Sequence, residues 1–160
     1  MKKPLLLLLC LSVLCLSATA FAQSPAAAAR AYRQAHELDI INEYYRLLAI
    51  PNVASDTVNI RRNADLISAM LQRRGVSTRL LEVTGAPPVV YGEINVPGAT
   101  RTLIFYAHYD GQPVEPAKWA GGDPFAPALR SASLETGGKD IPFPAKGQPF
   151  NPEWLIYARS

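Results

Sequence analysis

The sequence predicts an α/β fold in which two helices precede the strands of a mixed sheet. Two stretches, about 31–49 and 57–74, repeat apolar residues at the spacing of an amphipathic helix. Three strand-like runs follow at 76–83, 89–96 and 102–107, and glycine or proline turns separate them. Helices packed on a sheet in this way are typical of an α/β domain.

The first 22 residues have the pattern of a secretory signal peptide. Lys2 and Lys3 form a basic start, an apolar run covers Leu5–Leu16, and Ala20–Ala22 offers a small-x-small cleavage site. The alternative is a retained membrane anchor, for which the apolar run is short. We therefore expect a periplasmic or secreted mature chain that begins at Gln23 and does not associate with the membrane after cleavage.

Composition excludes several kinds of site from the mature chain. Both cysteines, Cys10 and Cys15, lie in the predicted signal, so no disulfide, cysteine zinc site or cysteine nucleophile is expected. Two of the 16 Lys and Arg residues also lie there, which leaves 14 against 13 Asp and Glu. A chain so close to neutral does not predict a nucleic-acid partner.

The two predicted helices have recognisable ends. The first ends before Pro51, because proline cannot continue a helix and restricts the residue before it. The second begins after Ser55 or Asp56, either of which is a good N-cap, and stops at Gly75. Ser24–Ala29 is expected to be a frayed lead-in.

The run Thr102–Ala107 is predicted to be the central strand. Its residues are apolar or strand-favouring without polar alternation, which is typical of a strand buried on both faces. Val76–Val83 alternates more and is placed nearer a sheet edge. Pro97 and Gly98 form the turn between Val89–Val96 and the central strand.

Residues 112–152 hold most of the prolines and glycines and are predicted to form a long surface loop near the site entrance. Trp119 and Phe125 are expected to pin its first part by packing, whereas 131–147 is expected to be a mobile insertion. Glu153–Tyr157 begins a further strand. The sequence ends three residues later, so we expect an incomplete domain, truncated at its C-terminal side.

His108 and Asp110 are the candidate site residues. They follow the predicted central strand two positions apart, and side chains two apart on an extended chain point the same way. In open α/β sheets, reactive groups collect beyond the carboxyl ends of strands. His108 can then bind a metal with Asp110 orienting its ring, act as a general base held by Asp110, or contact a ligand with it. A structural histidine at a strand end is the remaining alternative.

Other chemistries have little support in the sequence. A serine hydrolase would need a nucleophile elbow, and no Gly-x-Ser-x-Gly occurs. No glycine-rich phosphate loop is present either. His36 is interpreted as a solvated or helix-capping residue, and Glu115 and Asp123 as loop residues rather than metal ligands. Arg159 is not assigned to the site.

The segment His108-Tyr-Asp110-Gly-Gln-Pro-Val114, with Trp119 and Asp123-Pro-Phe125-x-Pro127, resembles the first metal-site motif of a family of di-zinc metallopeptidases and amidohydrolases. That family includes acetylornithine deacetylase, succinyl-diaminopimelate desuccinylase, carnosine-type dipeptidases and glutamate-carboxypeptidase-type enzymes, and the dipeptidase branch is the most similar. Leu48–Ser55 and Asn63–Gly75 resemble the segments that precede the motif. The resemblance covers Glu37–Phe125 and Trp154–Ser160.

The resemblance implies a partial zinc-peptidase-like catalytic domain. His108 matches a ligand of one of two zinc ions, and Asp110 matches the catalytic-site aspartate that supports the ligands. The bridging aspartate, the general-base glutamate, the remaining ligands and a smaller dimerisation domain would lie beyond Ser160. The implied substrates are small peptides or N-acyl amino acids, and a homodimer would form through that further domain. Because one imidazole does not make a catalytic zinc site, we expect the chain alone to be inactive.

A different class of function is also open. The chain would then be a non-catalytic, exported α/β scaffold domain that lacks a metal centre. An Asp-Asp-Lys-like segment after Ser160, followed by a Glu-Glu pair, would favour the hydrolase.

Overall fold

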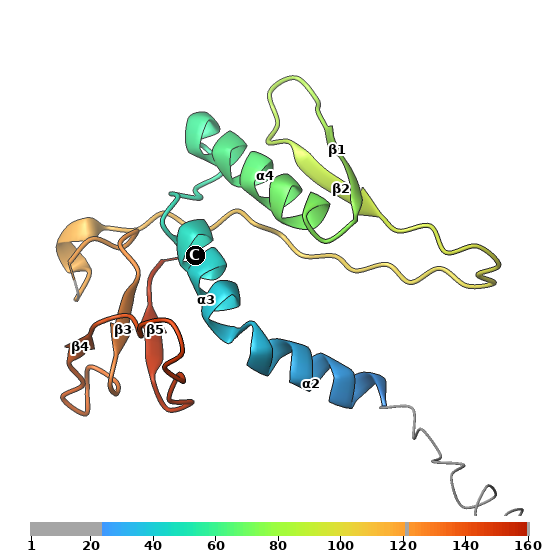
Figure 1. Ribbon diagram of the computed structural model, residues 1–160. Helices are drawn as coiled ribbons and strands as arrows, with labels where there is room; N and C mark the ends of the chain where they lie inside the picture. The colour runs from blue at the N-terminus through green and yellow to red at the C-terminus, as the bar shows by residue number, and fades with distance from the viewer. Residues whose placement is uncertain (1–23, 121, 160) are drawn as a thin grey trace, which may run out of the picture. The chain divides into compact units, whose positions relative to one another are not determined.

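The computed structural model describes residues 24–120 and 122–159, and the described chain is a mixed α/β fold with three helices and small antiparallel sheets (Figure 1). The predicted signal peptide, 1–22, lies outside the described residues. The chain divides into two compact units, Met1–His36 and Glu37–Ser160, and each is considered by itself. None of the helices in the described residues combines the length and the apolar character that crossing a membrane requires.

Helix α2 (Pro25–Ala35) is the described element of the first unit. The Ser24 side chain caps it by accepting a hydrogen bond from the Ala27 N–H at 3.2 Å, and Pro25 occupies the first turn. His36 caps the other end, where its ring stacks on Tyr32 with centroids 4.1 Å apart. The prediction of a frayed lead-in was therefore wrong, because a good N-cap and an alanine run favour helix. The capping interpretation of His36 is confirmed.

Helices α3 (Glu37–Leu48) and α4 (Thr57–Gln72) correspond to the two predicted helices, although the first predicted helix, 31–49, is interrupted at His36 and its start belongs to α2. The Asp56 carboxylate accepts a hydrogen bond from the Asn59 N–H at 3.1 Å, so Asp56 is the N-cap of α4. Gly75, with φ of 78°, ends the helix, and the Val76 N–H returns to the Leu71 carbonyl at 3.2 Å. Both predicted ends are confirmed.

A cluster of buried residues in the second unit lies on one face of α4. Ile60, Asn63 and Ala64 are buried there, and α4 packs against the hairpin of β1 (Ser77–Leu81) and β2 (Val89–Glu93), as Figure 1 shows. The strands pair antiparallel in a register that runs from Ser77 opposite Glu93 to Leu81 opposite Val89.

Gly92 lets the end of α4 approach this hairpin closely. A Cβ atom at Gly92 would lie 2.9 Å from Val76 Cγ1 and 3.5 Å from Leu71 Cδ1. Nearby, the hydroxyls of Ser68 and Thr78 are 2.7 Å apart and join the helix to β1. A small residue in the strand thus makes room for the helix, and a short polar pair fixes their contact.

Two strands of a second sheet lie in the region that the sequence predicted as one long loop, 112–152, and the third strand follows it. The strands are β3 (Ala128–Arg130), β4 (Asp140–Ile141) and β5 (Leu155–Tyr157), in the order β4-β3-β5 with antiparallel pairing. The strand-like character of 153–157 is confirmed. The prediction of one mixed sheet was wrong, because the strand ladders among the described residues are all antiparallel.

Aromatic side chains hold the segment 131–147, which was predicted to be a mobile insertion. Phe143 packs edge-on against Tyr45 of α3 and against Phe150, with ring centroids 5.1 Å and 5.2 Å apart, and Phe150 in turn meets Trp154 at 6.3 Å. The prediction overlooked Phe143 as an anchor.

The expected central strand, Thr102–Ala107, is the main correction. This segment takes part in no strand pairing among the described residues, and Figure 1 shows it as bare chain beyond β2. Leu103, Ile104, Phe105 and Tyr106 are 77% to 90% exposed. A strand exists only where a neighbour pairs with its N–H and C=O groups, so strand-favouring residues alone do not produce one.

The exposed apolar segment predicts self-association of the mature chain at high concentration. Uncharged, strand-favouring residues with free backbone groups pair readily with a second copy. We expect Ile104→Lys or Phe105→Glu to reduce the apparent mass measured by light scattering during gel filtration. Val58→Lys, which replaces a single exposed residue on α4, is the control and should change nothing. An unchanged mass for all three variants would contradict the prediction.

Glu43 predicts a specific loss of stability in acid. Hydrogen bonds from Arg74 and Arg73 hold the Glu43 pKa at about 2, below its ordinary value of 4.5, and the carboxylate is only 16% exposed. A lowered pKa stabilises the fold above pH 4.5, and this contribution disappears as the pH falls towards 2. Because both arginines are half exposed, we expect a contribution of about 1–2 kcal/mol.

Urea unfolding at several pH values measures this contribution. Glu43→Gln should be less stable than the natural chain at neutral pH, and the two should converge in acid. Asp39→Asn removes an exposed carboxylate from the same helix and is the matched control. A gap between Glu43→Gln and the natural chain that persists at low pH would show that lost packing, rather than lost charge, is responsible.

Candidate functional site

The structure brings His108 and Asp110 into contact, as the sequence predicted. The Nδ1 atom of His108 lies 2.9 Å from the backbone carbonyl oxygen of Asp110 and 3.3 Å from its carboxylate Oδ1. Both neighbours are acceptors, so we assign the proton of the neutral ring to Nδ1. The His108 side chain is 74% exposed, and Nε2 is left as the nitrogen that can bind a ligand.

Asn52, in the loop between α3 and α4, contacts the chain on both sides of Asp110. Its backbone carbonyl accepts a hydrogen bond from the Gly111 N–H at 2.8 Å, and its side-chain Nδ2 lies 3.4 Å from the Tyr109 carbonyl. Val53 and Gly111 form an isolated parallel bridge at the same place. Segments 57 residues apart are thereby joined directly at the candidate site.

A second contact holds Tyr109 itself. Its hydroxyl donates a hydrogen bond to the carbonyl of Pro88, which precedes β2. Burial raises the Tyr109 pKa above its ordinary value, and the nearby Asp110 carboxylate adds to that effect. The Tyr109 ring therefore serves as an anchor between the candidate site and the hairpin.

Arg159 contacts the residues that follow the candidate pair. Its Nε and Nη2 atoms donate to the Gln112 carbonyl at 3.2 Å and 3.0 Å, and its N–H donates to the Pro124 carbonyl at 2.7 Å. A shallow hollow of about 360 Å³ adjoins it. The hollow is lined by Pro113, Val114, Glu115, Lys118, Trp119 and Arg159.

Glu115 and Asp123, which were interpreted as loop residues, make local contacts within the loop. Glu115 pairs with Lys118 at 2.7 Å across a single turn of 3-10 helix (Pro116–Lys118). The Asp123 carboxylate accepts a hydrogen bond from the Phe125 N–H at 2.9 Å and closes a local turn. The bonds of both carboxylates are thus to groups two or three residues away in the same loop.

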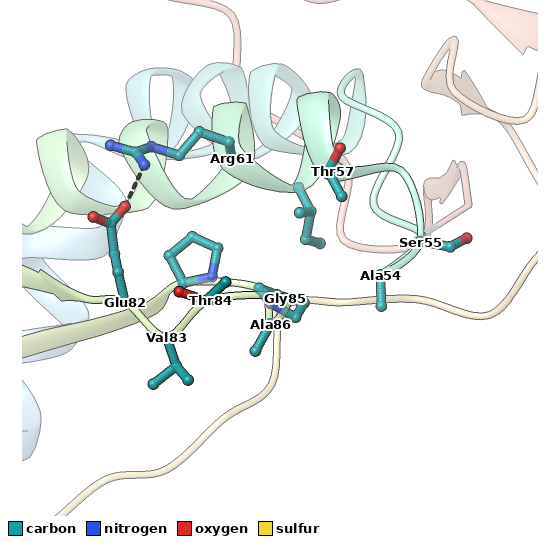
Figure 2. A pocket seen from close by; sticks show the side chains of 12 residues that line it. Ala54, Ser55, Thr57, Arg61, Glu82, Val83, Thr84, Gly85 and Ala86 are labelled. Carbon is teal, nitrogen blue, oxygen red and sulfur yellow. Dashed lines mark hydrogen bonds and ion pairs between the residues drawn. The ribbon is translucent and has the colours of Figure 1, made fainter.

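A larger cleft of about 670 Å³ lies between the start of α4 and the loop that joins β1 to β2 (Figure 2). Its ionisable side chains are Arg61 and Glu82, and they pair with each other, as the dashed line in Figure 2 shows. The other lining residues are Ala54, Ser55, Thr57, Ile60, Val83, Thr84, Gly85, Ala86, Pro87 and Pro88. Because these two side chains pair with each other, we assign no catalytic role to this cleft.

The metal-binding capacity of this arrangement follows from its donor atoms. Nε2 of His108 suits one position of a zinc site, and Asp110 suits the supporting carboxylate. Within 24–120 and 122–159, however, no three His, Cys, Asp or Glu side chains gather where they could share a metal ion. The described residues fit a contribution to a metal site but do not complete one.

Comparisons with protein-family models, curated proteins and solved structures found no match to this chain.

Sequence reasoning did not single out Asn52 and did not assign Arg159 to the site, and the structure places both in contact with the segment that holds His108 and Asp110. Asn52 follows a proline in a loop and carries no local signal of its role, because its contacts are with residues far along the chain. Arg159 lies two residues after β5, close to the end of that strand. That position was the one available signal.

Gly111 is predicted to be intolerant of a side chain. A Cβ atom there would lie 2.7 Å from Asn52 Oδ1 and 2.9 Å from Asn52 Nδ2, although the Gly111 backbone itself is not in a left-handed conformation. We expect Gly111→Ala to cost about 1–3 kcal/mol in urea unfolding. In an Asn52→Ala background the cost should fall, because the clashing amide is gone. Equal costs in the two backgrounds would contradict the proposed clash.

Proposed function

We propose that this chain supplies part of the active site of an exported metal-dependent hydrolase. The enzyme cleaves amide or peptide bonds of small peptides or N-acyl amino acids at a two-zinc centre. His108 is a ligand of one zinc ion through Nε2, and Asp110 orients its ring. Among the described residues, His108 and Asp110 are the ones assigned to this centre.

The observation that carries the proposal is the way in which His108 is held. A ligating histidine almost always donates its other ring N–H to a carboxylate or a backbone carbonyl, which fixes the tautomer and makes the ligand more basic. His108 has both kinds of acceptor within 3.3 Å of Nδ1, and its ring is largely exposed. A purely structural histidine at this place would be expected to turn its ring into the protein.

The residues at and around the candidate pair then have distinct roles. His108 presents a lone pair outwards, and the Asp110 carboxylate stabilises the positive charge that the imidazole gains when it donates that lone pair. Asn52 contacts the backbone between and just after the pair, at Tyr109 and Gly111, and Arg159 contacts the next residue, Gln112. Zinc at such a centre supplies a Lewis acid for the amide carbonyl and for the attacking water.

The proposal also limits what residues 23–160 can do by themselves. Catalytic zinc takes about three protein ligands and keeps one position open. With His108 as the one imidazole near Asp110, the isolated mature chain should bind zinc weakly and should not hydrolyse peptides. The activity belongs to the whole protein that carries this chain.

The test is zinc content and dipeptide hydrolysis of that exported protein in its natural form. We expect about two zinc ions per chain, as in other two-metal hydrolases. His108→Ala should lose most of the metal together with the activity. His36→Ala is the matched control, because His36 is the only other histidine in this sequence and caps a helix in the other unit.

The opposite result would support the scaffold interpretation. A protein without zinc or peptidase activity, and unchanged by His108→Ala, would be a non-catalytic exported domain. Zinc that is retained in His108→Ala but lost in His36→Ala would place the metal elsewhere.

A further inference from the structure

We propose that Asn52 is a positioning residue for the His108–Asp110 pair. This inference rests on the proposed function, because it assigns to Asn52 the task of fixing the ring through which His108 would bind metal. It adds a residue from a different segment of the chain, in the loop between α3 and α4.

The first argument is the geometry around Asp110. The group nearest to His108 Nδ1 is the backbone carbonyl of Asp110, at 2.9 Å, rather than its carboxylate. That carbonyl and the Gly111 N–H belong to the same planar peptide unit, and the Tyr109 carbonyl belongs to the unit before it, so contacts to these groups set its direction. Asn52 contacts the residues that flank Asp110, through its Nδ2 to the Tyr109 carbonyl and through its own carbonyl to the Gly111 N–H. The position of Asn52 therefore controls where the Asp110 carbonyl points.

The second argument is the cost that Asn52 carries. Asn52 is only 7% exposed, and its Oδ1 atom has no hydrogen-bond partner among the described residues. A buried acceptor without a partner costs about 1–3 kcal/mol. Turning the amide over would bring Oδ1 against the Tyr109 carbonyl, so the present orientation is the one that Tyr109 allows. An apolar residue of similar size would fill the space without this cost, but it would not hold the Tyr109 carbonyl.

The third argument is rigidity. Asn63, buried on the core face of α4, donates through Nδ2 to the Pro51 carbonyl at 2.8 Å. The residue before Asn52 is thus fixed to the best-packed helix of the second unit. A site is most precise when its supporting groups are themselves fixed to packed elements. His108, although exposed, is connected to the core through Asp110, Asn52 and Asn63.

The experiment measures the tautomer of His108 in the mature chain by long-range ¹H–¹⁵N NMR, at about pH 8, where free imidazole is neutral. The chain has two histidines, so the ring signals are readily assigned, and His36 is an internal reference. We expect the natural chain to hold His108 in the Nδ1–H form. Asn52→Ala should shift His108 towards the Nε2–H form that free histidine favours, without changing His36.

Two further variants complete the test. Gly111→Ala, whose Cβ would displace the Asn52 amide, should produce the same shift at His108, and it covers the case in which Asn52→Ala does not fold. Asn59→Ala removes a side-chain hydrogen bond to Asp56 at the start of α4 and should leave the His108 tautomer unchanged. A merely structural role for Asn52 would lower stability without changing the tautomer.

The outcomes separate this inference from the proposed function. An Nδ1–H tautomer that persists in folded Asn52→Ala or Gly111→Ala overturns the positioning role, and so does an equal shift in Asn59→Ala. Zinc content of the whole exported protein tests the metal separately, because the isolated mature chain is expected to bind zinc weakly. A whole protein without zinc, beside a tautomer that depends on Asn52, would count against the zinc proposal and leave the positioning role in place.

Discussion

The buried face of α4 is the constraint on which the rest of the second unit depends. Ile60, Asn63 and Ala64 are packed there, and the hairpin of β1 and β2 lies against the same helix. Asn63 is the unusual member, because a buried amide must find hydrogen-bond partners and it finds the carbonyls of Pro51 and Asn59. The core therefore fixes a loop as well as a hairpin, and that loop leads to the candidate site.

Elements with local signals could be predicted from the sequence. Helix α4 was predicted from its apolar spacing, its Asp56 cap and the glycine that ends it, all of which act within a few residues. Strand β3 could not be predicted in the same way. It is three residues long and exists through pairing with two other short strands, and that information is not local. The strand predicted at Thr102–Ala107 was wrong for the opposite reason, since its strand-favouring residues have no described neighbour to pair with.

In the candidate site too, local features could be predicted from the sequence and long-range contacts could not. The contact between His108 and Asp110 follows from their spacing and could be predicted, but the leading role of the Asp110 carbonyl could not, because it depends on the local turn of the backbone. The contribution of Asn52 depends on a contact across 57 residues. A single sequence carries no signal of such a contact. The chemistry of the pair was therefore accessible from the sequence, and the means of holding the pair was not.

His108 and Asp110 are restrained only from their C-terminal side within the described residues. The exposed segment Thr102–Ala107 precedes them, and the loop that carries Asn52 contacts the residues after His108. The segment Thr102–Ala107 is exposed and pairs with no strand among the described residues, so it does not restrain the His108 ring from the N-terminal side. After His108, three restraints follow in close succession, at Tyr109, Gly111 and Gln112. Strands paired to Thr102–Ala107 would restrain the same histidine from the other direction and bury the apolar side chains at the same time. A neighbour of that kind would therefore act on the packing of the segment and on the orientation of His108 together.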